Sequence, residues 1–171
     1  MSGNEAGSAP CQVRPATYDD LELMGLFSSK MARETEGRDI DPAHVAASLK
    51  HVLDDPSLGQ MFIAEMDGRV IGSYLVNGRE WSEWRNGIYY WITGLYVVPE
   101  YRRHGVMFEL YRAAVNWVRE QPHGLGLRAY VHRDNNLESL LGDGTGEKNN
   151  RDEYRLTPMR ATPYVVIEVM V

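Results

Sequence analysis

The chain has 171 residues, of which 43% are hydrophobic and 25% are charged, and its formal net charge is −6. This length and composition predict one soluble domain with a hydrophobic core. No apolar run approaches the roughly 20 residues that a membrane-spanning helix needs, and the negative charge argues against a general nucleic-acid binder. We therefore expect neither a membrane nor a nucleic acid as a partner.

Residues 1–10 are small and polar, and we expect them to form a disordered tail before a single domain over residues 11–171. The tail lacks the basic start and apolar core of a secretory signal. The single cysteine, Cys11, cannot form an internal disulfide, which favours a reducing, cytoplasmic location. Because Cys11 has no activating neighbour in the sequence, we do not expect it to be catalytic.

In chain order, the first half of the sequence predicts a strand, two helices and two more strands, at Gln12–Ala16, Thr17–Glu36, Asp41–Leu53, Met61–Met66 and Arg69–Asn77. Thr17 and Asp20 have the spacing of a capping box at a helix start. Pro42 falls in the first turn of the second helix, where proline is tolerated. Asp67-Gly68 is a strong signal for a tight hairpin between the two later strands.

The second half predicts a polar loop, a long strand, a helix and two further strands, at 78–87, Ile88–Val98, Gly105–Glu120, Leu125–His132 and Tyr164–Val171. The long strand is mostly apolar, which is typical of a central strand buried on both faces. The helix that precedes Leu125 implies a crossover to a parallel neighbour. We therefore expect an α/β fold with a mixed sheet.

The segment 97–108 has the chemistry of an anion-binding site. Pro99 ends a strand, and Gly105 opens a helix whose first N–H groups carry partial positive charge. Arg102 and Arg103 add guanidinium groups that suit phosphate oxygens. Such a helix start favours a pyrophosphate ligand, although a solvated basic turn would have the same composition.

This segment resembles motif A of the GNAT family of N-acetyltransferases, whose turn reads Arg/Gln-x-x-Gly-x-Gly/Ala. Arg102-Arg103-His104-Gly105-Val106-Met107 fits the turn, and Leu95–Tyr101 fits the strand before it. The order of the predicted elements also matches that fold, which has a mostly antiparallel central sheet flanked by helices. Met107 stands where the family usually has Gly or Ala, but its backbone N–H is retained and its position faces the core.

The resemblance implies an acetyl-CoA donor bound in a V-shaped opening between the strands Ile88–Val98 and Leu125–His132. Backbone groups of Leu95, Tyr96 and Val97 would pair with the pantetheine arm, and an N–H near Tyr96 would polarise the thioester carbonyl. A bulge at Gly94 would splay the strand. The pyrophosphate would lie against Arg102, Arg103, His104, Gly105, Val106 and Met107.

The family's second motif is less regular in this chain. Asn135 stands at its asparagine position and would bind the pantetheine amide or cap a helix. Tyr154 resembles the tyrosine that protonates the leaving thiolate, but it lies 19 positions after Asn135, and Pro158 replaces a glycine. The helix that the family carries in this motif would therefore be broken, extended or partly melted, and we expect a flexible loop over residues 142–150. A tyrosine packed beneath the last strand is the alternative for Tyr154.

No motif marks the general base or the site for the amine. His132, at a strand end, and Glu83, in the polar loop, are the candidate bases, with Glu80 as a further carboxylate. The loop carboxylates would otherwise be solvated charges. Trp81 and Trp84 would stack on a flat or cationic amine, or they would pack within the protein or at a dimer face.

We predict an N-acetyltransferase that moves an acetyl group from acetyl-CoA to a primary amine of a small molecule or protein. The amine would attack directly in a ternary complex, without a metal. A homodimer is a further expectation. The alternative is a weakly active or inactive acyl-CoA-binding module, a regulator or partner subunit, because the second motif is irregular and no base is evident.

Overall fold

The computed structural model describes residues 10–132, 154–158 and 164–171. Its strands are β1 (Gln12–Pro15), β2 (Gly59–Met66), β3 (Arg69–Ser82), β4 (Gly87–Ile92), β5 (Tyr96–Val97), β6 (Gly124–His132), β7 (Tyr154–Pro158) and β8 (Tyr164–Met170). Its helices are α1 (Leu21–Glu36), α2 (Pro42–Asp54) and α3 (Val106–Glu120), with short 3-10 turns at Tyr18–Asp20, Pro56–Leu58 and Pro99–Tyr101. The expected tail, apart from its last residue, and the expected loop 142–150 lie outside the described residues.

Local signals mark the helix ends, although the predicted start at Thr17 is the cap of a 3-10 turn that leads into α1 at Leu21. The Thr17 N–H donates to the Asp20 carboxylate at 2.7 Å, which closes the capping box before α1. Gly37 ends α1 in the left-handed conformation, with φ 63°. The Asp41 carboxylate accepts from the Ala43 N–H at the start of α2. Within the described part of the chain, no helix has the length and apolar character needed to cross a membrane.

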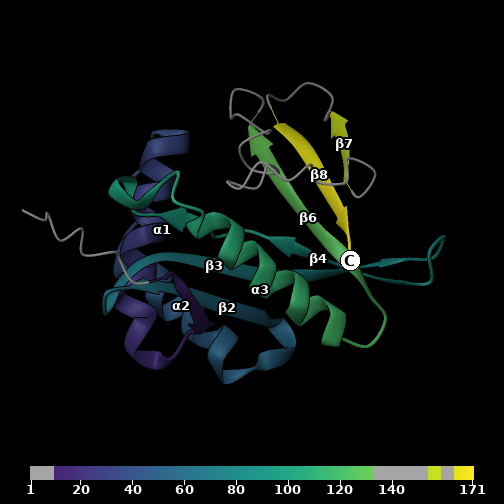
Figure 1. Ribbon diagram of the computed structural model, residues 1–171, viewed down its shortest axis with the longest axis horizontal. Helices are drawn as coiled ribbons and strands as arrows, with labels where there is room; N and C mark the ends of the chain where they lie inside the picture. Colours follow the sequence, from purple (N-terminus) through teal and green to yellow (C-terminus); the bar gives the residue numbers. More distant parts are fainter. Residues whose placement is uncertain (1–9, 133–153, 159–163) are drawn as a thin grey trace, which may run out of the picture.

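The strands form one sheet in the order β1-β2-β3-β4-β6-β8-β7, and β5 pairs with β3 beside β4. The β4–β6 pair is parallel, with α3 as its crossover, and the other described pairs are antiparallel. This arrangement confirms the expected α/β fold with a mixed, mostly antiparallel sheet flanked by helices. Figure 1 shows that β6 and β8 diverge in direction from β3 and β4.

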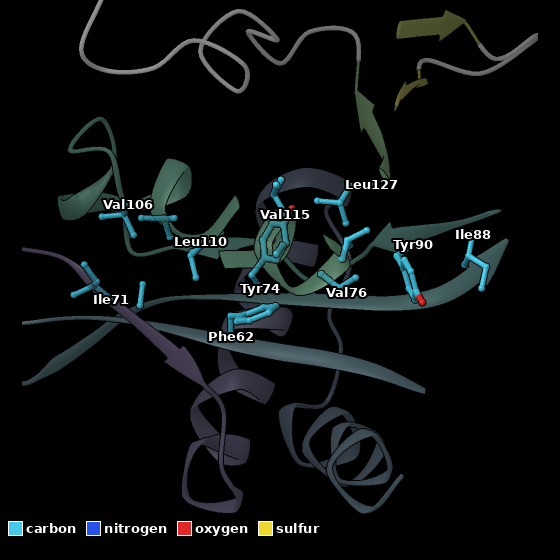
Figure 2. Close-up of a cluster of buried hydrophobic side chains, with 14 residues drawn as sticks. Phe62, Ile71, Tyr74, Val76, Ile88, Tyr90, Val106, Leu110, Val115 and Leu127 are labelled. Carbon is cyan, nitrogen blue, oxygen red and sulfur yellow. The ribbon is translucent and has the colours of Figure 1, made fainter. Parts of the chain in front are cut away.

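Two apolar cores lie on opposite faces of the sheet. The larger one packs α3, through Val106, Leu110 and Val115, against Tyr74 and other residues of the sheet (Figure 2). The smaller one packs α1 and α2 against β2 and β3. The helices α1 and α2 contact β2, β3 and β5, whereas their contacts to β4 and β6 are few or none. The helices α1 and α2 therefore leave one face of β4 and β6 largely uncovered, namely the face turned away from α3. Side chains on this face can reach solvent near the centre of the sheet.

Three expected elements differ in the structure. Strand β3 continues through Ser82, so the first half of the expected polar loop 78–87 is strand and forms a hairpin with β4. The expected strand Ile88–Val98 is divided into β4 and β5. Tyr154–Pro158, which we compared with the end of a helical motif, is a strand that pairs with β8. Cross-strand pairing, which a single segment does not encode, decides each of these differences.

Candidate functional site

The centre of the sheet opens where β4 ends. β4 and β6 pair in parallel up to Ile92 and Ala129, after which β6 continues against β8 and β5 continues against β3. A pocket with about 480 Å³ of space, part of it open to solvent, lies at this divergence. Its lining is predominantly apolar and comes from Tyr74, Ile92, Leu95, Met107, Tyr111, Leu127, Arg128, Ala129, Val131, Ile167 and Val169. The V-shaped opening expected from the resemblance is thus present, with α3 along one side of it.

A one-residue bulge produces the divergence on the β4–β5 side. Val76 pairs with Ile92 and Ser73 pairs with Tyr96. The β3 side of this interval spans three residues and the β4–β5 side spans four, so the β4–β5 side carries one extra residue. Gly94 lies within this bulge, and a Cβ there would stand 3.2 Å from the Leu75 Cβ. Glycine therefore permits a close approach to β3 at the point where the strand changes register.

The pairing of β5 fixes the direction of its backbone groups. The Val98 N–H donates to the Ile71 carbonyl at 2.9 Å. Because hydrogen-bonded positions alternate along an antiparallel pair, the backbone of Tyr96 also faces β3, and that of Leu95 and Val97 faces the opening. The N–H that can serve an oxyanion in the opening therefore belongs to Leu95 or Val97, one position to either side of the expected Tyr96.

The turn after β5 leads into α3 with its backbone N–H groups exposed at the helix start. Arg103 and Gly105 have φ angles of 67° and 75°, and Gly105 is the N-cap. The first helical hydrogen bond runs from the Glu109 N–H to the Gly105 carbonyl, so the N–H groups of residues 106–108 have no acceptor within the helix. A glycine cap has no side chain to cover them, and a Cβ at position 105 would meet nothing within 4 Å. This end of α3 can receive an anion.

Met107, which departs from the family pattern, is half-buried and packs against the larger core. Its side chain also lines the pocket at the opening. Val106 beside it is buried and anchors the helix start. Methionine is accommodated at this position because its side chain is directed away from the exposed N–H groups.

The two arginines of the turn have different surroundings. The Arg102 Nε donates to the Val97 carbonyl at 2.8 Å, and its Nη2 forms an ion pair with Glu34 of α1 at 2.7 Å. The guanidinium also lies over the Tyr96 ring, 5.4 Å from its centroid. Burial, and then the charge of Glu34, raises the pKa of the Tyr96 hydroxyl, which donates to that carboxylate. Arg102 therefore ties the turn to α1, whereas Arg103 is exposed at the helix start.

A charged cluster covers the sheet on the face turned away from α3. The Arg128 guanidinium lies 3.9 Å from the Tyr89 ring centroid and forms ion pairs of 2.6 Å with both Glu80 and Glu168. Only 19% of the Arg128 side chain is exposed, against 47% of Glu80. The hydrogen bond from Arg128 holds the pKa of the Glu80 carboxyl below its usual range, although burial acts in the opposite direction. Glu80 is therefore an anion that remains half in solvent.

An aromatic pair lies beside this cluster, at the apex of the opening. Trp91 of β4 and Tyr130 of β6 stack with ring centroids 4.5 Å apart and planes at 19°. The Trp91 Nε1 donates to Glu80 at 2.9 Å. Thr93, within the bulge, donates from its hydroxyl to Asn77 at 2.9 Å. In residues 10–131, no group of three His, Cys, Asp or Glu side chains is placed to hold a metal ion.

The expected acceptor residues of the loop lie away from the opening. Trp81 pairs with Ile88, at the other end of β4 from Ile92, about 13 Å along the strand. Its ring packs edge-on against His123, and Trp84 is 92% exposed at the hairpin tip beside Glu83. The geometry gives no support to an acceptor or base role for these three residues, so we do not include them in the proposed site.

The structure describes only the backbone of His132 and Tyr154. His132 ends β6 beside the opening and pairs with Tyr164. Tyr154 pairs with Val169, which pairs in turn with Leu127, so its backbone is two strands or about 10 Å from β6. Asn135 lies outside the described residues. Sequence reasoning did not find Glu34, Trp91, Arg128 or Glu168 as site residues. The packing of α1 brings Glu34 to Arg102, and the sheet register brings the other three together.

Comparisons with known proteins agree with this geometry. Residues 23–140 match the model of the acetyltransferase (GNAT) family. A possible acetyltransferase from Clostridium difficile 630 is 31% identical, over 74% of this chain and 83% of its own, with a TM-score of 0.64. No curated protein sequence gave a significant match.

Two more distant structures share the fold. Ribosomal-protein-alanine N-acetyltransferase from Brucella melitensis is 15% identical, over 94% of this chain and 99% of its own, with a TM-score of 0.70. PaiA N-acetyltransferase from Thermoplasma acidophilum, solved with coenzyme A, is also 15% identical, over 95% of this chain and all of its own (100%), with a TM-score of 0.66. The family match covers well over half of the sequence. This chain belongs to the GNAT family of acetyltransferases.

Proposed function

We propose that this protein is an acetyl-CoA-dependent N-acetyltransferase that acetylates a primary amine of a small molecule or protein. The observation that carries the proposal is the continuity of three features: an apolar pocket, a strand edge whose N–H groups face the opening, and a glycine-capped helix start. A donor with an anionic end and a long, extended arm is complementary to such a site. The complex of the Thermoplasma acidophilum protein with coenzyme A supports the same donor.

The residues present fit acetyl-CoA at each of its parts. The exposed N–H groups at the start of α3 and the Arg103 guanidinium would hold the pyrophosphate. The open space at Gly105 allows the phosphates to approach the backbone. The Leu95 carbonyl and the Val97 N–H would bind the pantetheine arm as an added strand edge. The Leu95 N–H would polarise the thioester carbonyl at the bulge.

The transfer itself needs one base and one acid. A neutral amine attacks the thioester carbonyl, so that a C–N bond forms and the C–S bond breaks within one ternary complex. A base takes the proton of the attacking amine, and the leaving thiolate receives a proton. His132, at the edge of the opening, is the candidate base, and Tyr154 is the candidate acid. Asn135 is the candidate partner for the pantetheine amide.

Two measurements test the proposed function. Isothermal titration with acetyl-CoA should show binding at one site, and thiol release over a panel of primary amines should then show turnover. Absence of acetyl-CoA binding would overturn the donor assignment. Binding without thiol release from any amine would instead favour the alternative, a non-catalytic acyl-CoA-binding module.

The acid is tested by Tyr154→Phe, which removes only the hydroxyl. We expect a fall in kcat of about 10²-fold, because general acid catalysis contributes about 10²–10⁴-fold, with unchanged acetyl-CoA affinity. Tyr18→Phe, at an exposed position in the turn before α1, is the matched control. An unchanged kcat in Tyr154→Phe would remove Tyr154 from the mechanism.

A further inference from the structure

The stacked rings of Trp91 and Tyr130 lie at the apex of the opening, on the side from which an acceptor would approach the thioester under the proposed function. Ile92 and Ala129 form the last parallel pair of β4 and β6. Trp91 immediately precedes this pair on β4, and Tyr130 immediately follows it on β6. The ring pair therefore bridges the two strands at the apex of the opening, and Tyr130 is 54% exposed.

The two faces of the opening differ in polarity. Leu127, Ala129 and Val131 line the apolar pocket on the α3 side. Because side chains alternate along a strand, Arg128 and Tyr130 point to the opposite face. Under the proposed function the pantetheine arm takes the apolar side, so a polar amine reaches the thioester from the face that carries the ring pair.

The ring pair is hydrogen-bonded to a carboxylate, that of Glu80. The Trp91 Nε1 donates to the Glu80 carboxylate at 2.9 Å, and this hydrogen bond increases the electron density of the indole ring. A cation is attracted to such a ring face, most strongly to that of tryptophan. Glu80 is half-exposed, so its charge is also accessible from solvent.

The same face already holds one cation in this manner. Arg128 lies over the Tyr89 ring between the carboxylates of Glu80 and Glu168, with Arg85 at 3.9 Å from Glu168. The two arginines offset the two carboxylates, so the cluster as a whole has little net charge. The attraction for a further cation therefore arises locally, from the exposed Tyr130 ring and the half-exposed Glu80 carboxylate.

Resting on the proposed function, we propose that Trp91, Tyr130 and Glu80 bind a positively charged group of the acceptor. The preferred substrates are then amines that carry a second cationic group, such as short diamines or basic side chains. The second cation rests on the rings while the amine to be acetylated enters the opening. This assignment names the substrate class of the site and adds no step to the transfer.

The test uses three acceptors of matched chain length whose far ends differ in charge: 1,4-diaminobutane, 1-aminopentane and 4-aminobutanoate. We expect kcat/KM to be highest for the diamine and lowest for the carboxylate, with about tenfold or more between them. Tyr130→Ala should reduce the ratio of diamine to monoamine by about fivefold. Tyr130→Phe retains the ring and should keep most of that ratio.

Tyr18→Ala is the matched control, because Tyr18 is 56% exposed and also lies near a cation, Lys50, but at the start of α1. It should leave the ratio unchanged. Equal rates for the three acceptors, or an unaltered ratio in Tyr130→Ala, would overturn the inference while the acetyltransferase activity stands. If no amine is acetylated, the inference is tested by titrating 1,4-diaminobutane into the protein in the presence of coenzyme A. Equal affinity for the diamine in the wild type and in Tyr130→Ala would overturn the inference.

Discussion

The two faces of the opening are constructed from different parts of the chain. The donor face consists mainly of backbone groups from one continuous segment, at Leu95, Val97 and residues 106–108. The face that we propose for the acceptor, called the acceptor face below, consists of side chains from β3, β4, β6 and β8, which converge around Trp91 and Arg128. Because backbone groups do not depend on side-chain identity, we expect the donor face to tolerate Met107, whereas single substitutions would alter the acceptor face.

The largest expected effect tests the direction of the backbone at the bulge. Replacing the Leu95 amide by an ester, with the corresponding α-hydroxy acid, removes one N–H and leaves every side chain in place. We expect kcat to fall by about 10²–10³-fold, the usual consequence of losing one oxyanion donor. The measurement is single-turnover acetyl transfer, compared with acetyl-CoA affinity from titration.

The matched control is the same ester replacement at Tyr96. Its N–H faces β3, so the ester should lower the free energy of unfolding by about 1 kcal/mol, the typical net contribution of one hydrogen bond. Transfer in the folded enzyme should change little. A larger loss of kcat at Tyr96 than at Leu95 would show that the oxyanion donor is Tyr96, as the sequence alone suggested.

Charge reversal at the helix start comes next in size. Arg103→Glu places a negative charge where the pyrophosphate would lie, and we expect at least tenfold weaker acetyl-CoA binding, or about 1.4 kcal/mol. Arg119→Glu makes the same charge change near the other end of α3, about 20 Å away. Titration at two salt concentrations compares the variants, and equal affinities in both would refute the pyrophosphate assignment.

Much of the donor face could be predicted from the sequence, because its signals are local. The strand ending at Pro99, the glycine at 105 and the apolar periodicity of α3 all lie within one segment. The structure confirms the turn and the helix, although the strand before them is divided into β4 and β5. The bulge at Gly94 was also predictable, since a glycine within a strand often marks one. The sequence could not predict whether the N–H of Leu95 or that of Tyr96 faces the opening, because the register with β3 decides it.

The acceptor face could not be predicted for a related reason. Trp81 and Trp84 are close in sequence to the central strand, but the hairpin carries them toward the far end of β4. Glu80 reaches the site only because β3 extends past Asn77 and its carboxylate meets Arg128 of β6. Residues that are brought together by three strands leave no pattern within any one of them.

A smaller effect separates the two arginines of the turn. Glu34→Gln removes the ion pair of Arg102, whose side chain is 43% exposed. Exposed ion pairs contribute about 0–1 kcal/mol, and the bond from the Arg102 Nε to the Val97 carbonyl remains. We expect the free energy of unfolding to fall by less than about 1 kcal/mol and acetyl-CoA affinity to change less than about threefold. A tenfold gain in affinity would show that Arg102, once released, also binds the phosphates.

The smallest expected effect concerns the acceptor face and pH. The pKa of Glu80 is lowered in the folded protein, chiefly by the hydrogen bond from Arg128. A carboxyl with a lowered folded pKa stabilises the protein above its unfolded pKa, for which the ordinary value is 4.5, and this contribution is lost as the pH falls through the folded pKa. Because Glu80 is 47% exposed, solvent screening keeps the contribution below about 1 kcal/mol.

The measurement is the difference in free energy of unfolding between the wild type and Glu80→Gln, by urea titration at neutral pH and at about pH 3. The wild type should be the more stable at neutral pH, and the difference should shrink in acid. Other carboxyl groups titrate in both proteins and cancel in the difference, and Glu83→Gln at the hairpin tip controls for the lost charge. A difference that is unchanged in acid would mean that Glu80 contributes through packing. It would also remove the ionised carboxylate from behind the Trp91 ring, and with it the reason for the acceptor face to prefer a cation.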